Sequence, residues 1–400
     1  FLALYDVIHV NSTYDKGGAG IIAKNLHYSL LRNGLRSLYI FGYNGTVHNN
    51  YDEPSVGLSN PYEIKLNSYF YRLTTSVLFG RTNHLKVVDY ARSSDITHLH
   101  NIHGFFIDEI KLLDSIPYET KVVWTMHDEW LLTGRCAVTY GCDGYMKRCQ
   151  YCPHTDFYPA ALKRNYEERF LKKLEFLRNH TRLNIVVQSN YLKQKLMSSP
   201  LSEYVIDKIV VIPNGIDKFD YSESGTVLEK YGLQPGYVLF VSDYLTYSKG
   251  FDRLVEISSA LPDTRFVAVG KSKKVDASSI PNNIRILGRI PNTDVRSLYY
   301  YADNFLFLSR HDNYPTTILE AQDTCCPIIA VNTGAVAEML EGYPNSFVMK
   351  EYDPTIIQSS VRKFNGYHER SKTSMLKYEN TTEGMAKAYL DLYQMINNYE

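Results

Sequence analysis

The chain has 400 residues, and its 43 lysines and arginines are balanced by 43 aspartates and glutamates. This length predicts two to three domains, and the balance argues against nucleic acid as the main partner, because binding a duplex requires many phosphates to be neutralised. With 44% hydrophobic and 22% charged residues, the composition is that of a folded globular protein. No apolar run approaches the roughly 18–20 residues that span a bilayer, and six cysteines are too few for a disulfide scaffold. We therefore expect a cytoplasmic protein.

Short apolar runs alternate with helical patterns over residues 1–213. The runs are LYDVIHVN, SLYIFG, DITHLH, KVVWTMH, NIVVQ and KIVVIP. Runs that are apolar on both faces and separated by helices are what a buried parallel sheet requires. We therefore predict a doubly wound α/β domain over residues 1–213.

A polar, turn-rich stretch at residues 214–224 is predicted to be a linker to a second domain. After it the alternation resumes with YVLFVS, RFVAVG, NIRILG, NFLFLS and PIIAVN, which predicts a second α/β domain over residues 225–383. The helix before NFLFLS is expected to begin near Thr293, a suitable N-cap. Residues 384–400 are expected to form a C-terminal helix that can return to the first domain. Ligands of such open sheets bind beyond the carboxyl ends of the strands, so the loops there are the candidates for chemistry.

The first such loop contains Gly17, Gly18 and Gly20, after the first apolar run and before a helical pattern. Glycines let backbone amides and a helix N-terminus approach an anion closely. The spacing Gly18-x-Gly20-x-x-Ala23 fits a dinucleotide fingerprint, but no acidic residue follows about 20 residues later to hold a ribose. We predict a ligand-binding loop, with a purely structural turn as the alternative.

A second candidate is His127, which ends the run KVVWTMH and precedes Asp128. A histidine at the carboxyl end of a strand can donate or accept hydrogen bonds at a reacting sugar or phosphate. The alternative is a satisfied structural His–Asp pair. His100 and His103 follow another strand end and are candidates of the same kind.

Four of the six cysteines, Cys136, Cys142, Cys149 and Cys152, lie close together in a polar loop. Four thiolates at such spacing can close a tetrahedral zinc site, and Cys-x2-Cys is its usual half. Structural zinc is the prediction, with disulfides or unligated thiols as alternatives. A catalytic zinc is not expected, because four cysteine ligands leave no open position.

The fourth candidate is the segment between Asp312 and Glu320, after the run NFLFLS. A helix beginning near Pro315 would point its amides at an anion, and two carboxylates so placed can hold hydroxyl groups. A loop of polar residues with an ordinary N-cap is the alternative. The chain contains no D-x-D, G-x-x-x-x-G-K-[ST], H-E-x-x-H or G-x-S-x-G sequence, so several other chemistries lose their usual motifs.

Together these segments resemble the family 4 retaining glycosyltransferases of the GT-B fold over nearly the whole chain. The segment DNYPTTILE (312–320) matches the family's acidic-x7-Glu element, with Asp312 in place of the first Glu. VIPNGID (211–217), Lys249-Gly250-Phe251 and the sequence from Glu320 to Ala330 occur in the expected order. WTMHDEW and the cysteines after it look like a subgroup found in bacterial surface-polysaccharide clusters.

The resemblance implies a fold and an activity. The fold would be two Rossmann-like domains with parallel sheets and an interdomain cleft. The activity would be retaining transfer of a sugar, of the hexosyltransferase type, from a nucleotide diphosphate sugar to a glycan or lipid-linked glycan acceptor in polysaccharide biosynthesis. No cofactor or catalytic metal would be needed, since a cation and a helix dipole stabilise the leaving group. A sugar-nucleotide epimerase of the same fold, a dinucleotide-dependent oxidoreductase and a non-catalytic partner subunit are the alternatives.

The resemblance also implies roles for individual residues. The expected catalytic residues are His127 at the donor sugar, Lys249 at the diphosphate and Asp312 at the sugar hydroxyls. Glu320 would hold the ribose, and the base would stack at Gly288 and Ile290. The residues expected to bind the donor are Gly17, Gly18, Lys249, Gly288, Ile290, Asn313, Tyr314, Pro315, Thr316, Thr317 and Glu320.

Three positions depart from the family's pattern. The family usually has an arginine shortly before the lysine, whereas SDYLTYSKG (242–250) has none, so Arg289 or Lys271 would have to supply the second cation. Asp312 is one methylene shorter than the usual Glu. Cys325 stands where a glycine commonly ends the helix, and we expect it and Cys326 to be buried.

The segment at residues 161–178 has the pattern of a basic amphipathic helix, with six lysines and arginines around an apolar face. Such a helix can lie on an anionic membrane, which would suit a lipid-linked acceptor and a peripheral position on the inner face of the membrane. We expect an ordinary domain-surface helix, because Glu167, Glu168 and Glu175 dilute the positive charge, and we keep this membrane contact as the alternative.

Overall fold

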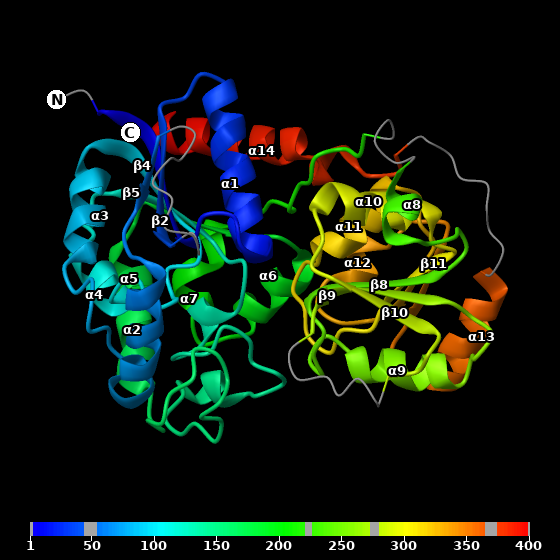
Figure 1. The fold of residues 1–400 in the computed structure, drawn as a ribbon. Coiled ribbons are helices and arrows are strands. Elements are labelled where there is room, and N and C mark those ends of the chain that lie inside the picture. The colour runs from blue at the N-terminus through cyan, green and yellow to red at the C-terminus, as the bar shows by residue number, and fades with distance from the viewer. Residues whose placement is uncertain (1–2, 44–53, 221–225, 273–279, 365–373, 399–400) are drawn as a thin grey trace. The chain divides into compact units, whose positions relative to one another are not determined.

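The computed structural model describes residues 3–43, 54–220, 226–272, 280–364 and 374–398 (Figure 1). The chain divides into two compact units. Unit 1 comprises Phe1–Gly215 together with Thr382–Glu400, and unit 2 comprises Ile216–Thr381. Residues 221–224 of the predicted linker lie outside the described residues.

Unit 1 is built on a seven-stranded parallel sheet with the strand order β3-β2-β1-β4-β5-β6-β7. The strands are β1 (Tyr5–Thr13), β2 (Ser37–Tyr43), β3 (Ser55–Gly57), β4 (Ser94–Leu99), β5 (Lys121–Thr125), β6 (Leu183–Val187) and β7 (Ile209–Val211). The helices are α1 (Gly17–Arg32), α2 (Pro61–Thr74), α3 (Asn83–Arg92), α4 (Glu109–Ser115), α5 (Glu167–Asn179), α6 (Asn190–Met197), α7 (Ser202–Val205) and α14 (Thr382–Asn398).

Unit 2 is built on a six-stranded parallel sheet with the strand order β10-β9-β8-β11-β12-β13. The strands are β8 (Val238–Tyr244), β9 (Phe266–Lys271), β10 (Ile284–Gly288), β11 (Asn304–Phe307), β12 (Ile328–Val331) and β13 (Ser346–Met349). The helices are α8 (Val227–Tyr231), α9 (Phe251–Ser259), α10 (Asn292–Tyr301), α11 (Thr316–Asp323), α12 (Val336–Met339) and α13 (Pro354–Phe364). In both sheets the chain order reverses beside the first strand, as in doubly wound α/β folds, and the predicted fold class is confirmed.

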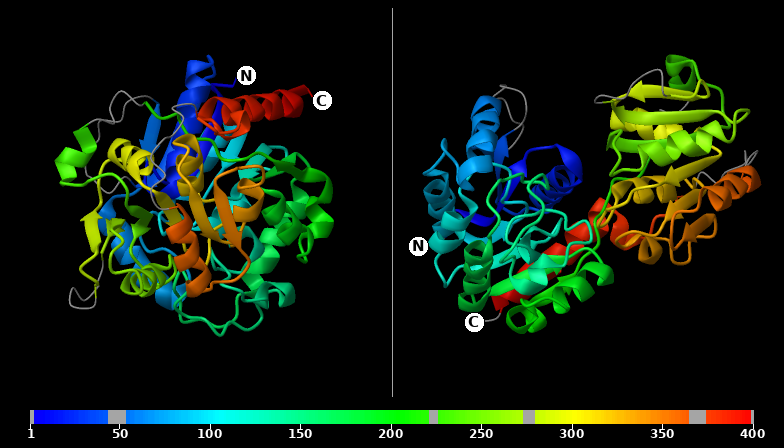
Figure 2. Two further views of the ribbon diagram at one scale, coloured as in Figure 1. Left: turned by 90° about the vertical axis from the view of Figure 1, so that its right-hand side faces the viewer. Right: turned by 90° about the horizontal axis from the view of Figure 1, so that it is seen from below.

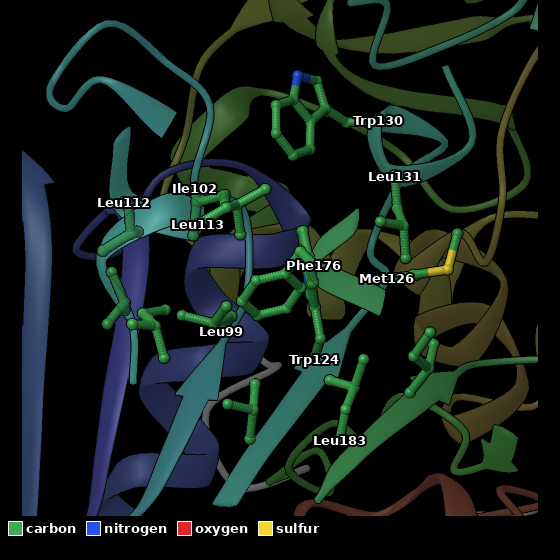
Figure 3. Close-up of a cluster of buried hydrophobic side chains, with 14 of the residues drawn as sticks. Leu99, Ile102, Leu112, Leu113, Trp124, Met126, Trp130, Leu131, Phe176 and Leu183 are labelled. Carbon is green, nitrogen blue, oxygen red and sulfur yellow. The ribbon is translucent and has the colours of Figure 1, made fainter. Parts of the chain in front are cut away.

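The central strands are buried on both faces, because helices cover both sides of each sheet. In unit 1 one core lies between the sheet and α3, α4 and α5, and Figure 3 shows Leu99, Trp124 and Leu183 of adjacent strands pointing into it beside Phe176 of α5. The rings of Trp124 and Phe176 meet edge to face, with their centroids 5.7 Å apart. This apolar layer holds the carboxyl ends of β4 and β5 in place.

The opposite face of the unit 1 sheet is covered by α1 and α14. In Figures 1 and 2 the C-terminal helix (red) lies beside α1 (blue). Met385, Tyr389 and Leu392 of α14 pack with Leu26 of α1 and Val7 of β1. The last helix therefore completes the core of the unit in which the chain begins.

One predicted helix start is confirmed and one is wrong. α10 begins at Asn292, within one residue of Thr293, but its N-cap is Pro291 and not Thr293. The segment predicted as a helix at 161–178 is irregular up to Tyr166, and α5 begins at Glu167. The short strands β3 and β13 were not predicted.

Candidate functional site

In unit 1 the Gly-rich loop joins β1 to α1. Gly17 has a φ of +69°, which favours glycine, and a Cβ added at Gly17 or Gly18 would meet no atom within 4 Å. Gly20 is held tightly instead, since a Cβ there would lie 2.6 Å from Thr13 Oγ1. The first turn of α1 contains no acidic residue, so its dipole is not countered there. The loop thus leaves open space for an anion at a helix N-terminus.

His127 follows β5 and is half-buried. Its Nε2 lies 2.9 Å from Nδ1 of His100, which follows β4. Burial lowers the pKa of His127 to about 4 despite the opposing effect of Asp128. The ring is therefore neutral at physiological pH and suited to hydrogen bonding rather than to charge pairing.

Asp128 is paired with His103 rather than with His127. Nε2 of His103 donates to Asp128 Oδ2 at 2.7 Å, and the amide of Trp130 donates to its Oδ1 at 2.9 Å. Burial acts to raise the pKa of Asp128, but His103 and the amide outweigh it and the pKa is lowered. A structural pair between His127 and Asp128 was the alternative predicted from the sequence. In the structure Asp128 forms such a pair with His103 instead.

The four cysteines of the loop after Trp130 gather together, and all six cysteines of the chain are free thiols. Thiols of Cys136 and Cys152 share a hydrogen bond. Amides of Gly134 and Gly144 donate to the sulfurs of Cys149 and Cys142 at 3.2 and 3.4 Å.

Four cysteines are a donor set that zinc takes, and the backbone amides that point at Cys149 and Cys142 favour the thiolate form, although burial raises the pKa of Cys149. In the part of the chain that the structure describes, no three of these sulfurs lie within 4.8 Å of one another. Sulfurs around zinc are about 3.8 Å apart, given a Zn–S bond of about 2.3 Å. Binding would therefore have to draw them together.

Two buried basic side chains organise this loop. The guanidinium of Arg135 donates to the carbonyls of His154, Phe157 and Pro159 and lies 3.8 Å from Cys152 Sγ. Lys173 of α5 donates to the carbonyl of Thr133 at 2.7 Å. Neither residue was recognised from the sequence as part of the loop.

The basic helix prediction is wrong in part. Lys173 is fully buried, with its Nζ 3.2 Å from the centre of the Trp130 ring, and Arg169 is buried in an ion pair with Glu109. Two of the six basic side chains of the segment 161–178 therefore cannot reach a membrane surface. None of the helices in the described ranges is long and apolar enough to cross a bilayer.

In unit 2 the structure brings Lys249 and Asp312 together. Nζ of Lys249 lies 2.7 Å from Asp312 Oδ2, and both side chains are partly exposed. Lys249 belongs to the loop between β8 and α9, and Asp312 to the loop between β11 and α11. Two of the expected catalytic residues thus meet beyond the carboxyl ends of adjacent strands.

Two glycines hold these loops in place. A Cβ on Gly250 would lie 2.2 Å from the carbonyl oxygen of Leu308, and one on Gly334 would lie 1.8 Å from that of Asp312. Both have positive φ, +82° and +59°. Gly334, in the loop after β12, was not recognised from the sequence, although a glycine just after an apolar run was the available signal.

α11 begins at Thr316 with Pro315 as its N-cap, and within the described chain no side chain caps it. Its first turn carries no acidic residue. The positive end of the helix dipole, to which the amides of Thr316 and Thr317 belong, is therefore not compensated by an acidic side chain there. Asn313 is fixed by its carbonyl, which accepts from the amide of Ala335 at 3.0 Å. Tyr314 points its hydroxyl to Asn380, which donates at 2.7 Å.

Glu320 is the fifth residue of α11, about one turn after Thr316, and is buried. Burial raises its pKa, while Arg296, Asn292 and Tyr299 oppose the shift. Nδ2 of Asn292 donates to Glu320 Oε1 at 3.4 Å. A carboxylate has about four lone-pair sites, so Glu320 can also accept a hydrogen bond from a ligand hydroxyl.

The remaining predicted residues of unit 2 lie at other strand ends. Gly288 ends β10 with a φ of +70° and open space at its Cβ position, and Ile290 packs partly against the core. Arg289 is exposed. Lys271 ends β9, and its Nζ lies 5.9 Å from the centre of the Tyr244 ring.

An unpredicted cation, Arg310, lies two residues before Asp312. Its guanidinium pairs with Asp252 at 2.8 Å and stacks 3.6 Å from the centre of the Tyr247 ring. Its amide also donates to the carbonyl of Ser248 at 2.9 Å. Arg310 therefore ties the loop before α11 to the loop that carries Lys249.

Two family models of glycosyltransferases match the sequence. Residues 16–218 match the family described as Glycosyltransferase Family 4. Residues 229–373 match the one described as Glycosyl transferases group 1. The two matches fall on unit 1 and unit 2.

Two curated proteins are similar to the chain. It is 27% identical over 375 residues to the putative colanic acid biosynthesis glycosyl transferase WcaC of Escherichia coli K12, covering 89% of this chain and 90% of that protein. It is 22% identical over 256 residues to the alpha-galactosylglucosyldiacylglycerol synthase of Streptococcus pneumoniae, covering 60% and 66%.

Solved structures share the fold. Sucrose-phosphate synthase from Thermosynechococcus elongatus aligns with a TM-score of 0.68 at 13% identity, over 99% of this chain and all of that one. HepE of Anabaena, solved in complex with UDP-glucose, aligns with a TM-score of 0.61 at 14% identity, over 98% of each chain.

Proposed function

This chain belongs to glycosyltransferase family 4 and has the GT-B fold, and on that premise we propose a specific reaction for it. It transfers a hexose from a nucleotide diphosphate sugar to a glycan or lipid-linked glycan acceptor, with retention at the anomeric carbon. The similarity to WcaC supports a place in polysaccharide biosynthesis. The bound UDP-glucose of HepE supports a nucleotide-sugar donor.

The observation that carries this proposal is the arrangement in unit 2 of Lys249, Asp312 and the start of α11. A cation beside uncapped amides at a helix N-terminus is a site for a diphosphate. As the bond to the leaving group breaks, negative charge grows on the diphosphate, and Lys249 with the amides of Thr316 and Thr317 stabilises it. No metal ion is assigned to this step.

Asp312 has two functions in this proposal. In the structure it holds the ammonium of Lys249 at 2.7 Å, which orients that cation. Its second oxygen is then available to accept a hydrogen bond from a sugar hydroxyl. Gly288 and Ile290 receive the base, while Gly17, Gly18 and His127 of unit 1 contact the donor phosphates and sugar.

The ribose assignment of Glu320 gives a direct test. Replacing Glu320 with Ala removes the acceptor for a ribose hydroxyl, and such charged hydrogen bonds contribute about 1.5–3 kcal/mol. We expect the affinity for the matching nucleoside diphosphate to fall about 10- to 100-fold in isothermal titration, relative to wild type and to the exposed control Glu341→Ala. Unchanged affinity would remove the ribose assignment.

A second candidate, a non-catalytic partner subunit, is favoured by one departure. No arginine precedes Lys249 in the segment 242–250, and Lys249 is already paired with Asp312, so the positive charge available to a diphosphate is small. Activity that appears only with a co-purified protein would favour this candidate. Turnover of the donor without any acceptor would favour the epimerase instead.

We also propose a structural zinc ion, held by Cys136, Cys142, Cys149 and Cys152. The backbone amides that donate to the sulfurs of Cys149 and Cys142 support this proposal.

We further propose that the exposed residues of the segment 161–178 contact the membrane that carries a lipid-linked acceptor. This proposal rests on four basic residues that are exposed or half-buried, Lys163, Arg164, Lys172 and Arg178. Such a contact would place the protein at the cytoplasmic face of the membrane.

A further inference from the structure

Three histidines of unit 1 form a continuous hydrogen-bonded chain. Nδ1 of His9, in β1, lies 3.0 Å from Nε2 of His100. Nδ1 of His100 in turn lies 2.9 Å from Nε2 of His127. His9 and His100 are 0% and 2% exposed. The chain therefore runs from a half-buried histidine at the carboxyl edge of the sheet into its interior.

The rings of this chain are neutral. Burial lowers the pKa of His9 and of His100, and neighbouring histidines lower both further. A neutral imidazole carries one proton on one of its two nitrogens. Each of the two nitrogen–nitrogen contacts needs one proton, and two protons would clash there.

These requirements leave only two arrangements of the protons. In the first, every ring carries its proton on Nε2, and His127 donates inward. In the second, every ring carries it on Nδ1, and His127 accepts at Nε2. The tautomer of His127 is thus tied to that of His9, two rings away.

The buried end of the chain favours the second arrangement. Nε2 of His9 is buried and has no hydrogen-bond partner in the described part of the chain. An orphaned buried N–H is rarer in folded proteins than an under-satisfied acceptor. A proton on Nδ1 of His9, donated to His100, avoids the orphaned donor.

A metal ion is a less suitable use of these rings. Nitrogens of His9, His98 and His100 lie within 4.8 Å of one another. However, His98 is bonded at Nδ1 to the hydroxyl of Tyr393 at 2.6 Å and at Nε2 to that of Thr125 at 2.7 Å. Both nitrogens of His100 belong to the chain described above. A metal would have to displace several of these bonds.

We propose that His9 and His100 are positioning residues that fix His127 as the tautomer protonated on Nδ1, so that His127 offers a hydrogen-bond donor to an oxygen of its ligand. Given the proposed function, that oxygen belongs to the donor sugar. Which nitrogen of a histidine is protonated is set by the partner of the other nitrogen, and here that partner is a second histidine.

The test uses the full-length chain labelled with 15N-histidine, in which long-range 1H–15N spectra report which nitrogen of His127 is protonated. In wild type we expect the proton on Nδ1. In His100→Leu the ring that pairs with Nε2 of His127 is removed, both tautomers of His127 become available, and the His127 signals should move towards the average of the two. The matched control is His27→Phe, since His27 is also buried and its ring lies 5.9 Å from that of His9, but it is outside the chain.

A second substitution at His100 tests the same link by rescue. The amide of Asn in His100→Asn can donate to Nε2 of His127 and should preserve the tautomer, whereas His100→Leu cannot. We expect kcat/KM to fall about tenfold in His100→Leu, the lower end of the loss when a functional histidine is deprived of its orienting partner, and to be largely restored in His100→Asn.

Three results would overturn the inference. They are a wild-type His127 protonated on Nε2, an unchanged His127 spectrum in folded His100→Leu, and a metal ion bound stoichiometrically through these histidines. The spectra need no substrate. If the tautomer responds as expected while no nucleotide sugar is bound or turned over, the proposed function fails and the positioning role stands.

Discussion

At the scale of single residues, the strongest feature is the ion pair of Lys249 with Asp312, which joins two loops that are 63 positions apart in sequence. The sequence predicted both residues, but it could not predict that they touch. Their contact depends on Gly250 and Gly334, whose lack of a side chain lets the loop backbones approach carbonyl oxygens.

Removing the cation should weaken diphosphate binding. Lys249→Met keeps the length of the side chain but not its charge, and a charged hydrogen bond is worth about 1.5–3 kcal/mol. We expect kcat/KM for the donor to fall about 10- to 100-fold in steady-state assays, with little change for Lys350→Met, an exposed lysine of the same unit. Equal activity of the Lys249 variant and wild type would show that this lysine does not meet the leaving group.

Cys325 illustrates a departure that the structure resolves. It stands where a glycine commonly ends the helix, and it adopts a left-handed φ of +54° just after α11. The turn is therefore made as a glycine would make it, at the strain cost of a side chain in this region. Cys325 and Cys326 are 4% and 0% exposed, and their predicted burial is confirmed.

At the scale of elements, the cysteine loop depends on interactions that no local pattern reveals. The loop after Trp130 is held by Lys173 from α5, 40 residues after Thr133, and its Nζ donates to the carbonyl of Thr133. A helical wheel places Lys173 on a polar face, but the ring of Trp130 and two carbonyls bury it. Lys173 is therefore not among the basic residues of this segment that can meet a membrane.

Metal analysis tests the zinc proposal at this scale. We expect about one zinc per chain in purified protein, because four cysteine ligands make a closed tetrahedral site. Cys142→Ser should lose the metal, whereas the matched change at a buried cysteine outside the loop, Cys325→Ser, should keep it. If wild-type protein that was purified without chelators contains no zinc, the proposal is wrong.

Helix α14 shows why unit boundaries cannot be read from chain order alone. Its Tyr389 and Tyr393 hydroxyls bond Thr125 and His98 at 2.8 and 2.6 Å. Each partner is more than 260 residues earlier in sequence. The apolar spacing of the last residues predicted a long helix, but only the structure shows that this helix covers strands β4 and β5.

At the scale of the whole molecule, the alternation of apolar runs and helices predicted both sheets well. Most predicted strands begin and end within a few residues of the observed ones, because a strand buried on both faces has a continuous apolar sequence. β3 (Ser55–Gly57) and β13 (Ser346–Met349) were missed because three or four residues at a sheet edge carry too little pattern. His9 was missed for a different reason, since its partner His100 lies 91 residues away.

The buried histidines predict how the folding stability of the whole protein depends on pH. Burial lowers the pKa of His27 to about 4, and it lowers those of His9, His98 and His100 as well. An unfolded histidine titrates near 6.5, so between about pH 6.5 and 4 the unfolded chain binds more protons, and stability falls as the pH falls.

Each such histidine should cost about 1 kcal/mol between pH 7.5 and 5.5. Urea unfolding at these two pH values should therefore show a loss of several kcal/mol at the lower one. In His27→Phe the loss of unfolding free energy between the two pH values should be smaller by about 1 kcal/mol, the contribution of one histidine. Stability that is equal or higher at pH 5.5 would contradict the neutral state of these rings in the folded protein.

The proposed reaction is tested by the anomeric configuration of its product. The purified chain is incubated with a panel of nucleotide diphosphate sugars and with glycan and lipid-linked glycan acceptors, and any product is analysed by NMR. We predict that one donor releases its nucleoside diphosphate only when an acceptor is present, and that the new bond keeps the donor's anomeric configuration. An inverted product, or no nucleotide bound and none released with any donor, would contradict the account.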